Sequence, residues 1–407
     1  MRQPAERAHA LDALRAIAML LVVFAHAAVP YLDLPLGNLP WAIRADAPSA
    51  LLSHAFWWLH PFLMPLFFVL AGLFAAQAAG TRGPHAFLGQ RARRILVPLL
   101  AAGVVLLPVV FYVFAAGWWL SGDATWDEIR RVKFRPPIQS ELFGPAHLWF
   151  LENLFIYCAL YWVVQVMRPA DRVASGRARR WRSRILDSPW RPLWCAIPTV
   201  LILGSDLEIF TTHRNAFVPP LGRFLHFGVF FVIGVLLPPV RAQRGDLLRS
   251  AAYLVVSVPL FVWLESLLRT HRLAPLPVAE QLLVASLVAL CAWLTIFAVL
   301  GLSNALLTGQ RASLRHLFEA SFWIYLVHLP IVAALQIPLA QVAAPALLKC
   351  LAVTCVASAL CLWSYGRWVR GTALGALLEG RSIYSPQRAQ RVAAEDAAVI
   401  HLCDPLR

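Results

Sequence analysis

The chain has 407 residues and a formal net charge of +15, but only 14% of its residues are charged and 60% are hydrophobic. Soluble proteins carry about a quarter charged residues, so the composition excludes an ordinary soluble globular protein. The apolar residues fall into runs of about 20, the length of helix that crosses the hydrocarbon layer of a membrane. The sequence therefore predicts an all-α fold, a polytopic membrane helix bundle that sits in a lipid bilayer.

We expect about ten transmembrane helices, because ten apolar runs approach the necessary length. Their ranges are 11–31, 55–78, 95–118, 146–167, 190–206, 222–240, 249–268, 281–301, 317–338 and 346–366. Pro192 and Pro198 interrupt the fifth run and make it the weakest. We divide the chain into a membrane domain, residues 1–370, and a polar C-terminal tail, residues 371–407.

The basic residues predict the orientation of the bundle. Most of them lie between the helices, on the side that also holds the N-terminus. The positive-inside rule then places both termini in the cytoplasm. The basic run at 172–184 faces anionic lipid in this arrangement, so the net charge does not indicate a nucleic-acid partner.

The first helix carries two polar side chains in an apolar stretch, RAIAMLLVVFAH. Eleven helical residues turn about 20° beyond three full turns, so Arg15 and His26 share one face. Asp12 neighbours Arg15 on that face. Arg15 lies near the inner surface and can extend its head group into water, whereas His26 cannot. His26 is a candidate reactive group, and the alternative is a neutral imidazole bonded to a neighbouring helix.

Other histidines gather at the outer ends of the predicted helices. This distribution predicts a polar chamber that opens outward, and ordinary interfacial histidines are the alternative. The histidines at this side besides His26 are His54, His60, His147, His213, His226, His271 and His328.

The inner side offers a different chemistry. Arg91, Arg93 and Arg94 precede the third helix, where guanidinium groups can bind phosphates bidentately. The alternative is that they only anchor the helix. Glu152, inside the fourth helix, is a candidate to pair with an arginine or to orient a histidine. The spacing of the seven cysteines indicates neither a disulfide framework nor a metal site.

Six segments in the correct order resemble acyltransferase family 3, and most closely its branch of glucan succinyltransferases. They are LDALRAIAMLLVVFAH, HPFLMPLFFVLAG, RARRILVP, HLWFLENL, GRFLHFGVFFVIGVLL and SFWIYLVHLPI. The second segment departs from the family, which often has Ser-Gly where this chain has Ala71–Gly72. The resemblance implies transfer of an acyl group from cytoplasmic acyl-CoA to a hydroxyl of an extracytoplasmic carbohydrate, in a bacterial inner membrane. Acyl-CoA is then a co-substrate, and no bound cofactor or metal is expected.

The resemblance also implies roles for the candidate residues. The donor phosphates would meet Arg91, Arg93 and Arg94, while Asp12 and Arg15 would hold the inner half of a channel. His26 would act as general base or carry the acyl group covalently, and the sequence leaves both routes open. The side chains expected to orient the acceptor or the base are His60, His147, Trp149, Glu152 and His328.

Two other functions compete with acyl transfer. A transporter or flippase of an acylated or lipid-linked glycan would use the same buried charges as a substrate path. A structural or sensor protein would need the histidines only at the interface. Within the enzyme interpretation, acetyl and succinyl groups remain alternatives, as do a periplasmic glucan, an exopolysaccharide, a lipid-linked sugar and an antibiotic as acceptors.

Overall fold

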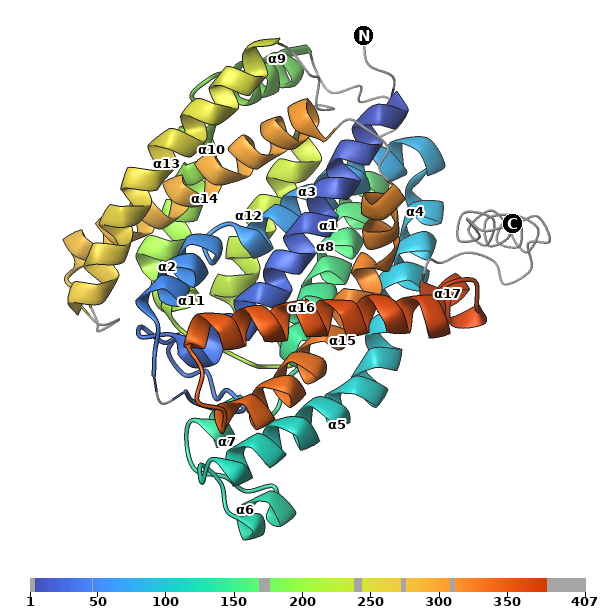
Figure 1. Ribbon diagram of the computed structural model, residues 1–407. Helices are drawn as coiled ribbons and strands as arrows, with labels where there is room; N and C mark the ends of the chain where they lie inside the picture. Colours follow the sequence, from blue (N-terminus) through green and yellow to red (C-terminus); the bar gives the residue numbers. More distant parts are fainter. Residues whose placement is uncertain are drawn as a thin grey trace, which may run out of the picture.

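A computed structural model describes residues 4–45, 47–167, 176–237, 244–271, 276–307 and 312–378. Its longer helices are α1 (Pro4–Ala28), α2 (Ala50–Leu59), α3 (Leu63–Arg82), α4 (Pro84–Arg91), α5 (Val97–Leu120), α8 (Trp149–Met167), α9 (Gly176–Leu186), α10 (Arg191–Ser205), α12 (Leu221–Leu236), α13 (Arg244–His271), α14 (Val278–Leu306), α15 (Ala312–Ala340) and α16 (Ala346–Ser364). Short helices are α6 (Trp126–Arg131), α7 (Ile138–Glu141), α11 (Glu208–Thr211) and α17 (Ala373–Leu378). The all-α prediction is confirmed (Figure 1).

Among the described residues, eight helical segments are long and apolar enough to cross a membrane, and α10 and α12 are shorter apolar helices. Each of the ten predicted ranges overlaps one of these segments. Side chains on α5 such as Val104, 78% exposed, present an apolar surface to the surroundings, as expected for a helix that faces lipid. The chain is therefore a multi-pass membrane protein. The cytoplasmic location of the termini stays a prediction, and residues 379–407 of the expected tail lie outside the described residues.

Prolines explain two differences from the predicted helices. The second predicted helix is split into α2 and α3 around Pro61, since a proline lacks the N–H that would continue the helix. Pro192 was expected to interrupt the fifth helix, but it lies in the first turn of α10, where its missing N–H costs nothing. Pro198 is accommodated inside α10.

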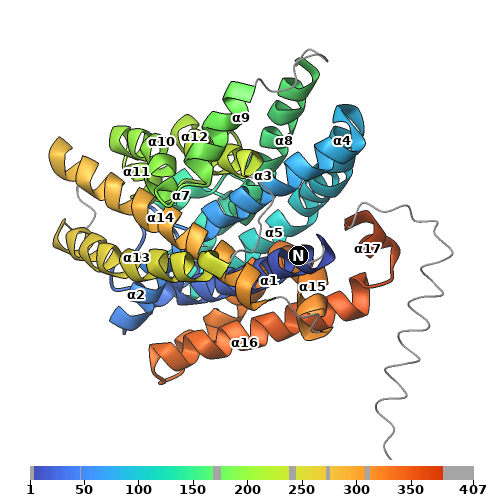
Figure 2. The ribbon, with the colours of Figure 1, turned by 90° about the horizontal axis from the view of Figure 1, so that it is seen from above.

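Helix α1 runs through the middle of the bundle and packs against α14, α15 and α16 (Figures 1 and 2). Seen from above, α16 lies along one edge and α10, α11 and α12 lie on the opposite side. Helix α3 crosses α12 at Gly72 and Gly234. A Cβ at Gly72 would lie 2.1 Å from the carbonyl oxygen of Phe231, so the absence of a side chain allows the two backbones to meet.

The segment after α1 covers one end of the bundle. Leu32 forms an isolated bridge with Ser49, and Gly37 forms another with Thr212, in the segment between α11 and α12. The Trp118 indole of α5 donates to the carbonyl of Trp41 at 3.0 Å. These contacts hold residues 29–45 over the end of α1 that carries His26.

Candidate functional site

Three histidines from distant parts of the sequence form a cluster, which we call the histidine cluster. His26 lies near the end of α1, His147 immediately before α8, and His328 in the middle of α15. The ring centroids of His26 and His328 are 5.0 Å apart, and those of His147 and His328 are 5.4 Å apart. The structure therefore brings together three of the histidines that the sequence places at the outer side.

Backbone hydrogen bonds fix the protonated nitrogen of each imidazole. His26 Nδ1 lies 2.8 Å from the carbonyl oxygen of Val22, and His147 Nε2 lies 2.8 Å from that of Leu326. His328 Nδ1 lies 2.8 Å from the carbonyl oxygen of Tyr325. Only an N–H can donate to a carbonyl, so these nitrogens carry the hydrogens of neutral rings.

The other ring nitrogens are therefore left as acceptors. His147 Nδ1 and His328 Nε2 are buried and have no hydrogen-bond partner in the part of the chain that the structure describes. Buried polar atoms nearly always have a partner, so these two lone pairs indicate a place for a hydrogen-bond donor such as a hydroxyl group. In the third ring, that of His26, the Nε2 atom carries the lone pair and can accept a proton.

Trp41 and Gln336 complete the cluster, although the sequence analysis did not identify them. The Trp41 ring lies 5.9 Å from that of His26, and its indole donates to Gln336 Oε1 at 2.8 Å. The Gln336 amide donates to the carbonyls of His26 and Ala27, and the side chain is completely buried. A glutamine inside an apolar helix was the available signal, since such a residue needs partners.

His213 is another of the histidines that the sequence places at the outer side. It follows the bridge to Gly37 and its backbone N–H donates to the carbonyl of Gly37 at 2.6 Å. Burial, aided by the positive charge of Arg223, lowers the pKa of His213 to about 4. Through Gly37, the backbone of His213 is joined to residues 29–45, which lie over the end of α1 that carries His26.

His60 has a different environment. Its Nε2 donates to the carbonyl of Phe210 at 3.0 Å, and its ring packs against the rings of Phe56, Trp57 and Phe210. These contacts fix the chain where α2 gives way to α3. The structure therefore gives His60 a packing role beside Phe210 and shows no contact of its ring with the histidine cluster among the described residues.

The two candidates on α8 also lie outside the cluster. The Trp149 ring packs 4.8 Å from that of Phe227, in an aromatic group that includes Phe68. Glu152 has a buried Oε2 atom without a hydrogen-bond partner. Among the described residues, the expected pairing of Glu152 with an arginine or a histidine is not seen.

Arginines converge at the other end of α1. Arg15 lies 3.9 Å from Asp12, and its guanidinium lies over the rings of Phe74 and Phe318. The charges of Arg91 and Arg94 act on Arg15, and Arg91 donates to the carbonyl of Phe74 at 3.2 Å.

Arg93 is exposed, whereas Arg91 and Arg94 are half-buried. Arg91 ends α4, and Arg93 and Arg94 lie in a π-helical turn, Ala92–Leu96, which leaves Arg91 and Arg94 turned inward and Arg93 turned away. Of the three predicted phosphate-binding residues, two therefore lie beside Arg15.

The arrangement separates two kinds of chemistry along one helix. Arg15 and His26 are about 16 Å apart along the axis of α1, with cationic groups at one end and neutral imidazoles at the other. The cationic end can bind a phosphorylated or carboxylated group. The imidazole end can accept a proton from a hydroxyl.

The chain is similar in sequence to known proteins. A family model described as "Acyltransferase domain", that of acyltransferase family 3, matches residues 8–366. Proteins named glucans biosynthesis protein C from Escherichia coli O81 (strain ED1a) and E. coli (strain SMS-3-5 / SECEC) are each 25% identical over 350 residues. These alignments cover 81% of this chain and 83% of each relative. No solved structure gives a significant match to the chain.

Proposed function

Because the chain belongs to acyltransferase family 3 and is an acyltransferase, we propose that it transfers an acetyl or succinyl group from acyl-CoA to a hydroxyl of a glucan. The relatives named glucans biosynthesis protein C support a glucan acceptor. A periplasmic glucan or an exopolysaccharide would be reached from the outer side of a bacterial inner membrane. Acyl-CoA is a co-substrate here and not a resident cofactor.

The observation that carries this proposal is the opposition of arginines and histidines along α1. Arg15, Arg91 and Arg94 form a cationic group where the phosphates of a cytoplasmic donor would arrive. The pantetheine arm would then extend along α1 and bring the thioester toward His26. This geometry allows donor and acceptor to approach the reaction centre from opposite sides of the membrane.

His26 is the proposed base. Its Nε2 would take the proton from the sugar hydroxyl while the oxygen attacks the thioester carbonyl carbon. The tetrahedral intermediate would collapse with cleavage of the carbon–sulfur bond, and the proton would pass from His26 to the departing CoA thiolate. The unpartnered nitrogens of His147 and His328 would accept hydrogen bonds from hydroxyls of the acceptor and orient it. A covalent acyl-histidine remains the alternative route.

A donor titration tests this proposal. Acetyl-CoA and succinyl-CoA are titrated against the full chain in nanodiscs and against Arg91→Ala/Arg94→Ala. We expect saturable binding that weakens at least about tenfold in the double variant, because each charge-assisted hydrogen bond contributes about 1.5–3 kcal/mol. Arg93→Ala is the matched control, because the exposed Arg93 side chain should leave the affinity unchanged.

The titration also separates the enzyme from its main rival. A correctly folded sample that binds neither thioester would contradict the proposal and favour a transporter or flippase. Comparing the affinities for the two thioesters would identify the acyl group.

A further inference from the structure

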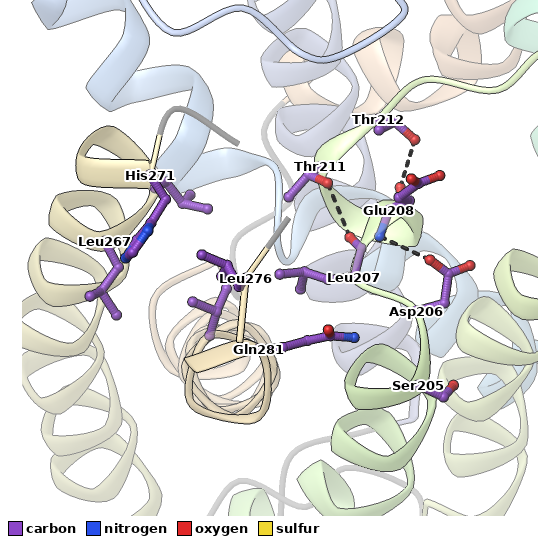
Figure 3. Close-up of a pocket in the computed structure, with 12 residues that line it drawn as sticks. Ser205, Asp206, Leu207, Glu208, Thr211, Thr212, Leu267, His271, Leu276 and Gln281 are labelled. Atoms are coloured by element: carbon purple, nitrogen blue, oxygen red, sulfur yellow. Dashed lines mark hydrogen bonds between the residues drawn. The ribbon is translucent and has the colours of Figure 1, made fainter. Parts of the chain in front are cut away.

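A cavity away from the histidine cluster lies between the segment that joins α10 to α12 and the helices α13 and α14 (Figure 3). Its volume of about 300 Å³ is at the lower end of the range of small-molecule sites, about 300–1,000 Å³. Its polar lining groups include Asp206, Glu208 and Gln281, and its apolar lining groups include Leu267 and Leu276. We call this cavity the Glu208 pocket.

Most hydrogen-bond donors of the Glu208 pocket are already used. The Ser205 hydroxyl donates to the carbonyl of Ile202 at 2.7 Å, and the Gln281 amide donates to that of Gly204 at 3.0 Å. The hydroxyls of Thr211 and Thr212 likewise donate to main-chain carbonyls, those of Leu207 and Glu208. A ligand therefore meets few free donors.

Hydrogen-bond acceptors of the Glu208 pocket remain available. One carboxylate oxygen of Asp206 accepts a hydrogen bond from the backbone N–H of Glu208, and the other accepts none from a described residue. The exposed carboxylate of Glu208 and the Oε1 atom of Gln281 are also without a donor among the described residues. Two of these acceptors are exposed carboxylates that water can solvate, and all three can accept hydrogen bonds from a ligand rich in donors.

The apolar lining groups and the charges of the pocket restrict the kind of ligand further. Leu207, Leu267 and Leu276 provide aliphatic surface, which suits the C–H faces of a sugar ring. Asp206 and Glu208 bring two carboxylates, which are opposed by one nearby guanidinium, that of Arg223. The ring of His271, also in the lining, is paired with a third carboxylate, that of Glu280. The excess of negative charge would repel an anionic ligand. A neutral carbohydrate matches both the acceptors and the aliphatic side chains of the pocket, because it combines several hydroxyl donors with apolar faces.

The Glu208 pocket is joined to the histidine cluster by the chain itself. Thr211 and Thr212 line the pocket, and His213 is the next residue, about 3.8 Å away between Cα atoms. Arg223 donates to the carbonyls of Glu208 and Thr212, and Gly37 bonds the backbone on both sides of Thr212. This segment is therefore held in place where it passes from the pocket toward His26.

We propose that the Glu208 pocket is a remote subsite for a neutral glycan acceptor, which binds one part of the chain while another part presents its hydroxyl to the histidine cluster. The inference rests on the proposed acyl transfer and adds to it a second binding site for the acceptor and a preference for uncharged chains. An uncharged glucan is accepted, and a polysaccharide of uronic acids is rejected by the two carboxylates.

Binding of defined oligosaccharides tests the subsite. The full chain in nanodiscs is titrated with a neutral gluco-octasaccharide and with an octasaccharide of galacturonic acid. We expect the neutral ligand to bind more tightly, and Glu208→Ala to weaken its binding about tenfold, the loss expected for one good hydrogen bond. Glu208→Lys should reduce the discrimination against the anionic ligand. Asp127→Ala, which changes an exposed carboxylate on α6, is the control and should bind like the wild type.

Kinetics supply a second readout. Glu208→Ala should raise KM for the octasaccharide and leave KM for a disaccharide acceptor and the affinity for acyl-CoA unchanged. Equal octasaccharide affinity in the wild type and in Glu208→Ala, or tighter binding of the anionic ligand by the wild type, would overturn the inference. If the protein consumes the thioester but Glu208→Ala does not change octasaccharide binding, the subsite is wrong and acyl transfer stands. If Glu208→Ala weakens octasaccharide binding but no thioester is consumed, acyl transfer is wrong and the binding site stands.

Discussion

Gln336 is the side chain that joins α15, the end of α1 and Trp41. Replacing it by leucine removes two donated hydrogen bonds and leaves the Trp41 indole unsatisfied. Each buried polar group left without a partner costs about 1–3 kcal/mol. We therefore expect Gln336→Leu to lower the thermal stability and the turnover number together. Gln341→Leu, at an exposed position beyond the end of α15, should change neither, and an equal loss in both variants would contradict the assignment.

His213 makes the stability of the protein depend on pH. Its pKa falls from 6.5 to about 4 in the fold, mainly through burial, so the native state resists the proton that the unfolded chain accepts. Stability is then full above about pH 6.5 and declines as the pH falls toward 4, by at most about 3 kcal/mol. In His213→Asn we expect a shallower decline over this window. Chemical unfolding at a series of pH values measures it, and identical slopes in both proteins would refute it.

The sequence predicted some of the site residues because helical geometry is local. The period of 3.6 residues is enough to place Arg15 and His26 on one face. It did not distinguish Arg93 from Arg91 and Arg94, which the sequence grouped together and which lie at a π-helical turn. It could not show which outer histidines meet, because that depends on how α1, α8 and α15 pack. Trp41 lies in a segment without helical periodicity, so no repeating pattern marked it.

The crossing of α3 and α12 makes a prediction at the scale of helices. A Cβ at Gly72 would strike the backbone of Phe231, which cannot move aside as a flexible side chain can. We expect Gly72→Ala to destabilise the protein by about 1–3 kcal/mol, the usual cost of overpacking. Gly80→Ala, on the same helix with open space around it, is the control and should be neutral or stabilising. Thermal unfolding in detergent compares the two, and equal melting temperatures would rule out the close contact.

The elements themselves were largely predictable, because long apolar runs must be helical in a membrane. The differences arise where a proline has two possible meanings. Pro192 was interpreted as an interruption although the first turn of a helix also tolerates it, and Pro61 proved to divide a helix that hydropathy alone had joined. The choice between these outcomes depends on neighbouring helices and loops, which a window of sequence does not contain.

For the whole molecule, the separation of donor binding from chemistry along α1 is the property that distinguishes the proposed enzyme from a transporter. His26→Ala removes the base but leaves Arg15, Arg91 and Arg94 in place. We expect acyl transfer to fall by about 10²–10⁴, the usual contribution of general acid–base catalysis, while the affinity for acyl-CoA stays unchanged. A radiolabelled acyl-CoA assay and a binding titration on the same preparation measure the two quantities, with His54→Ala, at a half-exposed position on α2, as the control.

Transfer that survives in His26→Ala would show that the base lies elsewhere. Simultaneous loss of donor binding would show that the two ends of α1 do not act independently.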